Sequence, residues 1–402
     1  MVGSHTAGSH MSARQMKGKP GDGRLAGVRK IAVLRPNAVG DFVFALPALH
    51  ALKRAYPDAE LVLLGLPWHA AFLEGRPGPV DRVVVVPPMA GIGLPPDPPD
   101  SPGDAAAQRF VQAMRGEGFD IACQMYGGGR YSNPLVASFG ARLAIGARAA
   151  DAPPLERWVR HVEPNNRRLA LLEVAALAGA VEVTLGQELA VTPADRDEAA
   201  HVLSEAGAGP ALAAGDATAT QEARPGAPPP SPLLVLQPGS TDPRRCWPAA
   251  SFAAVGDALA RTGAQVAVNG TAAEAPLVRR VIEAMETPAI DLSGKLGLGG
   301  LCGLIERAAC VVSNDTGPLH LALAIGTPAV GIFWLTNLID GTPLRQGLLR
   351  AALSLRQDCP ECGAPNLTTR CAHDASFVAD VPVGQVVAMA MDLLRAGGGA
   401  PP

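Results

Sequence analysis

Residues 313–333, SNDTGPLHLALAIGTPAVGIF, place polar and backbone-exposing residues directly before an apolar helical stretch. The amides of Thr316 and Gly317 would point out of the start of that helix, where the aligned peptide dipoles favour an anion. Asp315 precedes this turn, and His320 falls in the first turn of the helix, from where it could donate to a phosphate or a sugar hydroxyl. The stretch therefore predicts an anion site. The alternative is a well-capped helix with a structural histidine.

A second turn, residues 237–248 (QPGSTDPRRCWP), also follows an apolar run and precedes a helical segment. It combines hydroxyls at Ser240 and Thr241 with the guanidiniums of Arg244 and Arg245. A guanidinium offers forked N–H donors that match phosphate oxygens, and the hydroxyls add neutral donors. The turn predicts a phosphate-binding element, and the alternative is a surface turn with solvated arginines.

A third turn of this kind is Val39-Gly40-Asp41. Gly40 lets the backbone turn sharply, so that Asp41 lies at the start of the following helix. A carboxylate in this position can face a cleft and act as a general base. The alternative is an N-cap aspartate, which stabilises a helix by about 1 kcal/mol.

Four metal-ligating residue types lie close together near the carboxyl end of the chain. They are Cys359, Cys362, Cys371 and His373, with the spacing C-x2-C-x8-C-x-H. Three thiols and an imidazole are sufficient for a tetrahedral zinc site. Their place in a loop before the last helix predicts a structural clip rather than a catalytic centre, and the alternative is a surface loop with reduced thiols.

The elements that must position these residues alternate between short apolar, strand-like runs and helical segments. This alternation predicts α/β units with parallel sheets and helices on both faces, and ligands of such units bind at the carboxyl ends of the strands. All three turns lie at such ends. We expect residues 1–28 to form a disordered tail, 29–205 a first Rossmann-like unit, 206–231 an Ala/Gly/Pro-rich linker or insertion, 232–380 a second Rossmann-like unit, and 381–396 a terminal helix.

Bulk composition excludes several classes of protein. The 402 residues include 34 basic and 37 acidic side chains, which argues against nucleic-acid binding through a basic surface. The first strand is not followed by G-x-G-x-x-G, and neither a Walker loop nor a G-x-S-x-G motif occurs. No apolar run reaches the roughly 18 residues of a bilayer-spanning helix. The seven cysteines, an odd number, favour reduced thiols and a cytoplasmic location.

Three segments together resemble glycosyltransferase family 9, the bacterial ADP-heptose:lipopolysaccharide heptosyltransferases. They are residues 30–65 (KIAVLRPNAVGDFVFALPALHALKRAYPDAELVLLG), 237–259 (QPGSTDPRRCWPAASFAAVGDAL) and 291–333, which contains the motif D-T-G-x-x-H at 315–320. The resemblance implies a GT-B fold, in which two Rossmann-like domains face each other across a cleft and the C-terminal domain holds the nucleotide sugar. It also implies that the terminal helix packs back on the first domain.

Motif positions carry the family's site residues over to this sequence. The resemblance implies that Asp41 is the catalytic base and that Glu274 contacts the ribose. It assigns donor and phosphate binding to Ser240, Thr241, Arg245, Asp315, Thr316, Gly317 and His320. The family usually has lysine where Arg245 stands, and this departure leaves the identity of the donor open, because arginine keeps the charge but is bulkier.

We therefore expect an inverting glycosyltransferase that moves heptose from ADP-heptose to a hydroxyl of a cell-envelope glycan or lipopolysaccharide-core-like acceptor. Catalysis needs no cofactor, because a guanidinium and a helix dipole can replace Mg²⁺. The expected partners are the nucleotide sugar and a glycan or glycolipid, without nucleic acid. An acceptor at the inner face of the membrane would favour peripheral contact through Arg157, Arg160, Arg167 and Arg168.

Two other functions stay open at this point. An epimerase or other nucleotide-sugar enzyme on the same fold would turn over a donor without an acceptor. A nucleotide-sugar-binding protein that has lost catalysis would have no need of Asp41, which this sequence retains.

Overall fold

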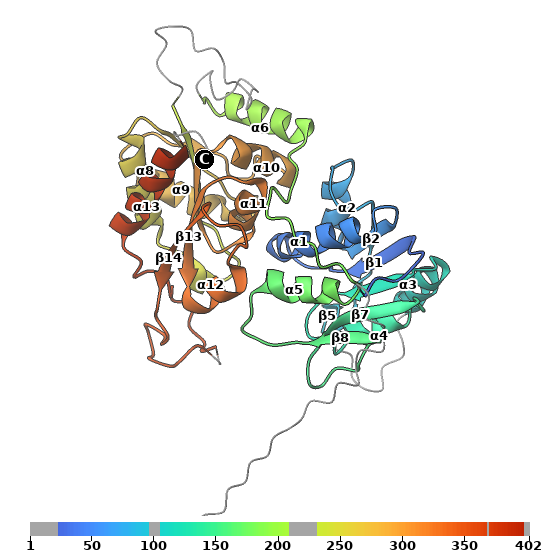
Figure 1. Ribbon diagram of the computed structural model, residues 1–402. Helices are drawn as coiled ribbons and strands as arrows, with labels where there is room; N and C mark the ends of the chain where they lie inside the picture. Colours follow the sequence, from blue (N-terminus) through green and yellow to red (C-terminus); the bar gives the residue numbers. More distant parts are fainter. Residues whose placement is uncertain (1–22, 96–104, 209–230, 368–369, 398–402) are drawn as a thin grey trace, which may run out of the picture.

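The computed structural model describes residues 23–95, 105–208, 231–367 and 370–397, which form two α/β units (Figure 1). Most of the tail expected at 1–28 and of the linker expected at 206–231 lies outside these residues. Each unit contains a six-stranded parallel sheet, and the two sheets share one strand plan. The predicted pair of parallel α/β units is confirmed.

The first unit is built on a sheet with the order β3-β2-β1-β6-β7-β8. Its strands are β1 Lys30–Leu34, β2 Glu60–Gly65, β3 Arg82–Val85, β6 Ile121–Gln124, β7 Leu143–Arg148 and β8 Arg157–Arg160. Alternate residues of β1 enter two different apolar cores, because side chains alternate across a strand. Ile31 and Val33 pack with α1 (Val39–Ala55) and α5 (Arg167–Ala176), whereas Ala32 and Leu34 pack with α3 (Ala105–Gly116) and α4 (Ser132–Ala137).

Smaller elements complete this unit. The helix α2 (Pro67–Leu73) follows β2, and the two-residue strands β4 (Met89–Ala90) and β5 (Gly93–Leu94) pair with each other.

The second unit repeats the plan with the strand order β11-β10-β9-β12-β13-β14. Its strands are β9 Leu233–Gln237, β10 Gln265–Val268, β11 Ile290–Asp291, β12 Cys310–Asn314, β13 Ala329–Trp334 and β14 Leu349–Ser354. Its helices are α8 Ala249–Ala260, α9 Ala275–Glu283, α10 Leu298–Arg307, α11 Gly317–Ile325, α12 Leu335–Gly341 and α13 Val383–Gly397, with short 3-10 turns η1 Pro243–Arg245 and η2 Ala272–Glu274. The strand order reverses beside β1 in the first sheet and beside β9 in the second, which is where such sheets bind ligands.

The terminal helix corrects one expectation. Predicted at 381–396 to pack back on the first unit, α13 instead packs against α8 and the strands of the second unit (Figure 1). Its apolar stripe, which includes Val386, Ala390 and Leu393, is buried in the same core as Trp247 and Phe377. The helix therefore covers one face of the sheet of the second unit.

The two units meet along an apolar junction. One buried core continues from α1 and α5 through α11 and α10, and α1 contacts α11 directly. The helix α6 (Pro193–Glu205), which the sequence-based boundary assigned to the first unit, packs on α10 of the second. Among the described residues, the chain therefore crosses between the units once, between α5 and α6. Along this crossing, the amides of Glu188 and Leu189 donate to the carbonyl of Ala324 in α11.

Candidate active site at the junction of the two sheets

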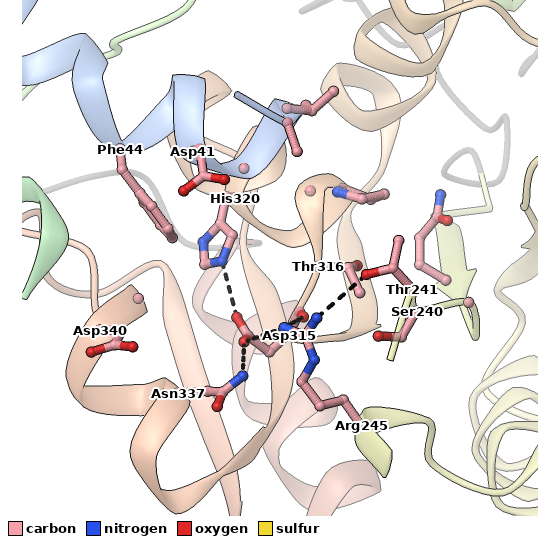
Figure 2. A pocket seen from close by; sticks show the side chains of 18 of the residues that line it. Asp41, Phe44, Ser240, Thr241, Arg245, Asp315, Thr316, His320, Asn337 and Asp340 are labelled. Atoms are coloured by element: carbon pink, nitrogen blue, oxygen red, sulfur yellow. Dashed lines mark hydrogen bonds and ion pairs between the residues drawn. The ribbon is translucent and has the colours of Figure 1, made fainter. Parts of the chain in front are cut away.

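A groove of about 460 Å³ lies where the carboxyl ends of the central strands of both sheets converge (Figure 2). The turns after β1, β9, β12 and β13 line it. It contains every residue that the sequence assigned to catalysis or donor binding, which are Asp41, Ser240, Thr241, Arg245, Glu274, Asp315, Thr316, Gly317 and His320. The structure thus brings three turns that are far apart in the sequence into one cavity.

Asp41 lies in the first turn of α1 and is held by two guanidiniums. Its Oδ1 atom is 3.3 Å from the NH2 of Arg35 and 3.0 Å from the NH1 of Arg167. Arg35 also donates to the backbone carbonyls of Asp41 and Met125, and burial lowers the pKa of Arg35 to about 10 against the opposing charge of Asp41. The helix begins after Ala38, with no side chain capping it. Asp41 is therefore not the N-cap that the alternative interpretation required, and its carboxylate faces the groove.

Asp315 is the centre of a hydrogen-bonded network on the other side of this groove (Figure 2). Its Oδ1 atom accepts from His320 Nε2 at 3.0 Å, and its Oδ2 atom accepts from Asn337 Nδ2 at 2.8 Å. Arg245 NH1 lies 3.5 Å from the same Oδ2 atom. Burial alone would raise the pKa of Asp315, but the hydrogen bond and charge of His320, together with Asn337 and Arg245, lower it below its usual value.

His320 has a different arrangement from the ligand donor that the sequence suggested. Its side chain is buried, packs edge-on against Phe44, and uses Nε2 to hold Asp315. Burial lowers the pKa of His320, opposed by the hydrogen bond and the charge of Asp315. Its Nδ1 atom has no hydrogen-bond partner among the described residues. In this geometry His320 positions Asp315.

Arg245 and Arg244 are adjacent in the turn after β9 but differ in how firmly they are held. Arg244 makes a forked pair with Asp242, including a contact of 2.7 Å from NH2 to Oδ2. The contacts of Arg245 to Thr241 Oγ1 and to Asp315 are 3.4 Å or longer, and its Nε has no partner among the described residues. The guanidinium of Arg245 thus retains donors for an anion in the groove.

The start of α11 supplies backbone amides at the same place. Thr316 occupies the N-cap position without a side-chain hydrogen bond to the helix, and Pro318 lies in the first turn. Gly317 is closely packed, since a β-carbon there would stand 3.3 Å from Val39 Cβ. The helix start can therefore accept an anion with its unsatisfied N–H groups and its dipole.

Glu274 lies directly over the backbone of the turn after β9. A β-carbon on Gly239 would stand 1.9 Å from Glu274 Oε1, so the carboxylate occupies the space directly over this glycine. The Glu274 carboxylate accepts from the amide and the hydroxyl of Thr271 at 2.8 and 2.9 Å. It is thereby fixed beside Ser240 and Thr241 in the groove.

Sequence reasoning missed several residues of the groove, including Arg167, Asn337 and Asp340, and it missed the buried Arg35, which pairs with Asp41. Asn337 and Asp340 come from α12, the short helix after β13, and Arg167 NH2 lies 3.6 Å from Asp340 Oδ2. The rule that every strand of a parallel sheet ends at the site could have identified Asn337, because it follows β13 as Asp315 follows β12.

The expectation of a basic membrane-contacting patch is wrong for Arg168. This side chain is 1% exposed, lies over the ring of Phe44 and donates to the carbonyl of Gly341. Arg167 directs its guanidinium to Asp41, and Arg157 donates to the carbonyl of Leu177. Of the four arginines, Arg160 and Arg167 are exposed and Arg157 is half-buried.

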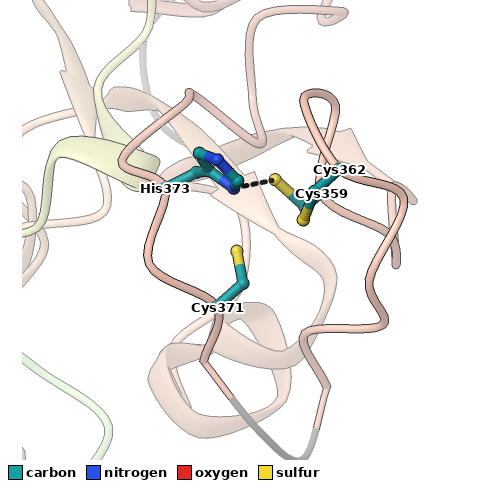
Figure 3. Close-up of side chains that lie close together, drawn as sticks. All are labelled: Cys359, Cys362, Cys371 and His373. Carbon is teal, nitrogen blue, oxygen red and sulfur yellow. Dashed lines mark hydrogen bonds between the residues drawn. The ribbon is translucent and has the colours of Figure 1, made fainter.

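The structure also brings together the four predicted metal ligands (Figure 3). The ligand atoms of Cys359, Cys362, Cys371 and His373 all lie within 4.8 Å of one another, and Cys359 Sγ is 3.7 Å from His373 Nδ1. None of the four lines the groove.

The fold agrees with comparisons to known proteins. The chain belongs to glycosyltransferase family 9 (heptosyltransferase), whose family profile matches residues 107–361. Lipopolysaccharide heptosyltransferase 3 of Escherichia coli is 27% identical over 166 residues, which are 40% of this chain and 46% of that protein. The match thus spans less than half the length of this curated relative.

Solved structures show the same architecture over nearly the whole chain. The glycosyl transferase family 9 structure from Veillonella parvula DSM 2008 aligns with a TM-score of 0.70 at 20% identity, covering 92% of this chain and 97% of that chain. The ADP-heptose LPS heptosyltransferase II from E. coli aligns with a TM-score of 0.67 at 17% identity, covering 92% and 100%. The two-domain GT-B fold is therefore confirmed. Within the described residues, every helix is too short or too polar to cross a membrane.

Proposed function

We propose that this protein is an inverting heptosyltransferase, which transfers heptose from ADP-heptose to a hydroxyl of a lipopolysaccharide-core-like acceptor. The observation that carries the proposal is that one groove holds the Asp41 carboxylate from the first unit and, from the second unit, Arg245 and the start of α11. A base and an anion-binding element on either side of one cavity are what the transfer of a sugar from a nucleoside diphosphate requires. Family membership and the ADP-heptose enzyme among its structural relatives favour this donor.

The leaving diphosphate would be bound by the second unit. Negative charge develops on its β-phosphate as the glycosidic bond breaks, and preorganised donors stabilise such charge. Arg245 retains unused N–H donors, the amides at Thr316 and Gly317 open on the groove, and the hydroxyls of Ser240 and Thr241 lie beside them. Glu274, fixed over Gly239, is in position to accept from a ribose hydroxyl. Positive charge for the leaving group thus comes from a guanidinium and a helix dipole.

Asp41 would act as the general base. It would accept the proton of the acceptor hydroxyl while that oxygen attacks the anomeric carbon from the face opposite the diphosphate, which inverts the configuration. Arg35 and Arg167 hold the carboxylate from two directions, and positioning of this kind is part of what makes a base effective. The acceptor would enter beside Arg167 and Asp340, at the end of the groove formed by α5 and α12.

We infer a cytoplasmic location, with the acceptor presented at the inner face of the membrane. All seven cysteines are free thiols in this structure, which suits a reducing compartment. The Cys/His cluster is assigned a structural role, since none of its members lines the groove.

The test is to replace Asp41 by asparagine, which keeps the shape of the side chain and removes its basicity. We expect Asp41→Asn to bind ADP as the unsubstituted protein does, and to lose about 10²- to 10⁴-fold in transfer rate. The exposed Asp58→Asn serves as the control and should leave both quantities unchanged. Normal turnover by Asp41→Asn would show that another residue is the base.

A binding and turnover screen across ADP-, GDP- and UDP-sugars tests the donor and separates the alternatives. Selective binding of the ADP-sugar, with turnover only when acceptor is present, supports the proposal. Turnover without acceptor would indicate an epimerase or hydrolase. Binding without turnover under both conditions would indicate a nucleotide-sugar-binding protein.

A further inference from the structure

We propose that Cys359, Cys362, Cys371 and His373 hold one tetrahedral zinc ion, and that this ion fixes the turn that carries Arg245. The zinc site stands on its own geometry. The second half of the inference rests on the proposed function, because it assigns Arg245 to the diphosphate of the donor.

The four side chains have the number, type and proximity that zinc requires. Three thiolates and one imidazole form a standard structural zinc set, with Zn–S bonds of about 2.3 Å. Ligand atoms on such a centre are about 3.8 Å apart, so the cluster, whose ligand atoms lie within 4.8 Å of one another, needs to contract by about 1 Å at its widest. The C-x2-C pair and the C-x-H pair approach from two segments of the loop (Figure 3).

The backbone around the first pair is already folded as a ligand-bearing turn. Gly363 donates its amide to the carbonyl of Cys359 at 2.9 Å, and the amide of Cys359 donates to Ala364 at 2.9 Å. Gly363 has a φ of 70°, in the left-handed region that favours glycine. This turn directs both Cys359 and Cys362 toward one point.

Outer hydrogen bonds hold the second pair. Asn366 accepts from the amide of Cys371 at 3.2 Å and donates to its sulfur at 3.4 Å. The Nε2 atom of His373 lies 3.7 Å from a carboxylate oxygen of Glu361, which leaves Nδ1 directed at Cys359. Metal-bound imidazoles and thiolates typically have such outer partners, which fix their orientation.

The same loop holds the donor turn on both sides of Arg245. The amide of Phe377 donates to the carbonyl of Arg244 at 2.8 Å, and the hydroxyl of Ser376 donates to the carbonyl of Cys246 at 2.7 Å. Arg244 NH1 also reaches Asn366 Oδ1 at 3.5 Å. A metal centre three residues before Ser376 therefore anchors the backbone from which the Arg245 guanidinium extends.

The first experiment measures metal in the full-length purified protein. We expect about one zinc per chain, and replacement by Co²⁺ should give the intense visible bands of a tetrahedral thiolate site. The control is Cys302→Ala, which removes a buried thiol of α10 and should leave the metal content unchanged. Iron in a stoichiometric amount would overturn the choice of zinc. The absence of any bound metal, with the thiols free or joined as a disulfide, would overturn the site.

The second experiment tests the coupling with ADP as the probe. Cys371→Ser should lose zinc and bind ADP about tenfold more weakly, because the charged donor turn loses its support. Cys371→His, which keeps a ligand at this position, should retain both zinc and ADP binding. If Cys371→Ser does not fold, removal of zinc from the intact protein by a chelator gives the same comparison.

The outcomes separate the two parts of the inference. Zinc loss with unchanged ADP affinity would overturn the coupling and leave the metal site in place. Failure of the zinc-loaded, unsubstituted protein to bind ADP or any nucleotide sugar would overturn the proposed function and the coupling, without affecting the metal site.

Discussion

Gly40 of α1 and Gly317 of α11 pack against each other where the two units meet. A β-carbon on Gly317 would stand 3.6 Å from the amide nitrogen of Gly40, and one on Gly40 would stand 3.7 Å from the α-carbon of Gly317. The N-termini of a helix from each unit therefore converge beside the groove. This contact fixes the distance between the Asp41 carboxylate, one residue after Gly40, and the anion-binding amides of α11.

A larger side chain at this contact should separate the two halves of the site. We expect Gly317→Val to push α1 from α11 and to weaken ADP binding roughly tenfold or more, since overpacking a closed contact costs about 1–3 kcal/mol. Gly384→Val is the matched control, because Gly384 also lies in a first helical turn and has open space around it. Titration calorimetry with ADP measures both variants. Equal affinities would show that the contact does not govern donor binding.

Removal of the Arg245 guanidinium should affect the reaction more than the fold. We expect Arg245→Ala to lower kcat/KM for the donor by about 10²- to 10³-fold, as for loss of one preorganised charge-stabilising donor. Arg245→Lys should recover part of this loss, because lysine keeps the charge but not the forked geometry. The exposed Arg279→Ala should be neutral. Steady-state kinetics with ADP release as the readout would contradict the assignment if Arg245→Ala and Arg279→Ala behaved alike.

A second carboxylate beside Asp315 should make the activity depend on pH. Asn337 Nδ2 donates to Asp315 Oδ2 at 2.8 Å. In Asn337→Asp this donor is replaced by a carboxylate oxygen, which accepts and carries negative charge as Asp315 does. Two facing carboxylates cannot both ionise without cost, so the variant retains a proton there to a higher pH. We expect its activity relative to the unsubstituted protein to fall as pH rises from 6 to 8. A pH-rate profile parallel to that of the unsubstituted protein would contradict the role of Asn337 in this network.

His69 should make stability depend on pH between 5 and 7.5. This side chain is fully buried, stacks on Trp68 and accepts from the amide of Leu66 through Nδ1. Burial lowers the pKa of His69 from 6.5 to about 4, and nearby Arg35 contributes in the same direction. The unfolded chain therefore binds the proton first, so stability is fully present above pH 6.5 and is lost as pH falls toward 4. The loss attributable to His69 is about 2 kcal/mol at pH 5.

Denaturation in urea at pH 7.5 and pH 5 measures this effect. His69→Gln changes the free energy of unfolding at both pH values. It should also remove the part of the difference between pH 7.5 and pH 5 that comes from titration of His69. The other buried histidine, His320, is present in both proteins, so its contribution cancels. An unchanged difference in His69→Gln would show that His69 titrates normally in the folded state.

The sequence was sufficient for the sheet architecture and for the residues that end the central strands. Continuous apolar runs such as Ile31–Leu34 and Leu233–Leu236 are typical of parallel strands covered on both faces. The edge strand β8, Arg157–Arg160, lacks such a run and carries arginine at both ends, so its pattern does not identify a strand. The apolar pattern therefore identified strands such as β1 and β9 but not β8.

The partners of Asp41 could not be predicted in the same way. Arg35 ends the first apolar run, and nothing local indicates that its side chain turns back onto a residue six positions later. Arg167 and Arg168 resemble solvated residues at the start of a helix, yet α5 lies against α1 and directs both into the junction. Such contacts depend on how two helices pack, which a single sequence without aligned relatives does not specify.

Within the described parts of the chain, the units are joined by one crossing, between α5 and α6, and by contacts that limit how far they can move apart. Widening the groove would either break the hydrogen bonds from Asn166 and Arg168 to the carbonyls at the end of α12 or expose the apolar surfaces of α1 and α11. Water can replace the broken hydrogen bonds, but it cannot offset the free-energy cost of exposing the apolar surfaces of α1 and α11. Substrate entry and ADP release should therefore proceed by rotation about the α1–α11 contact. A covalent cross-link from α5 to α12 would then slow turnover without altering the chemistry.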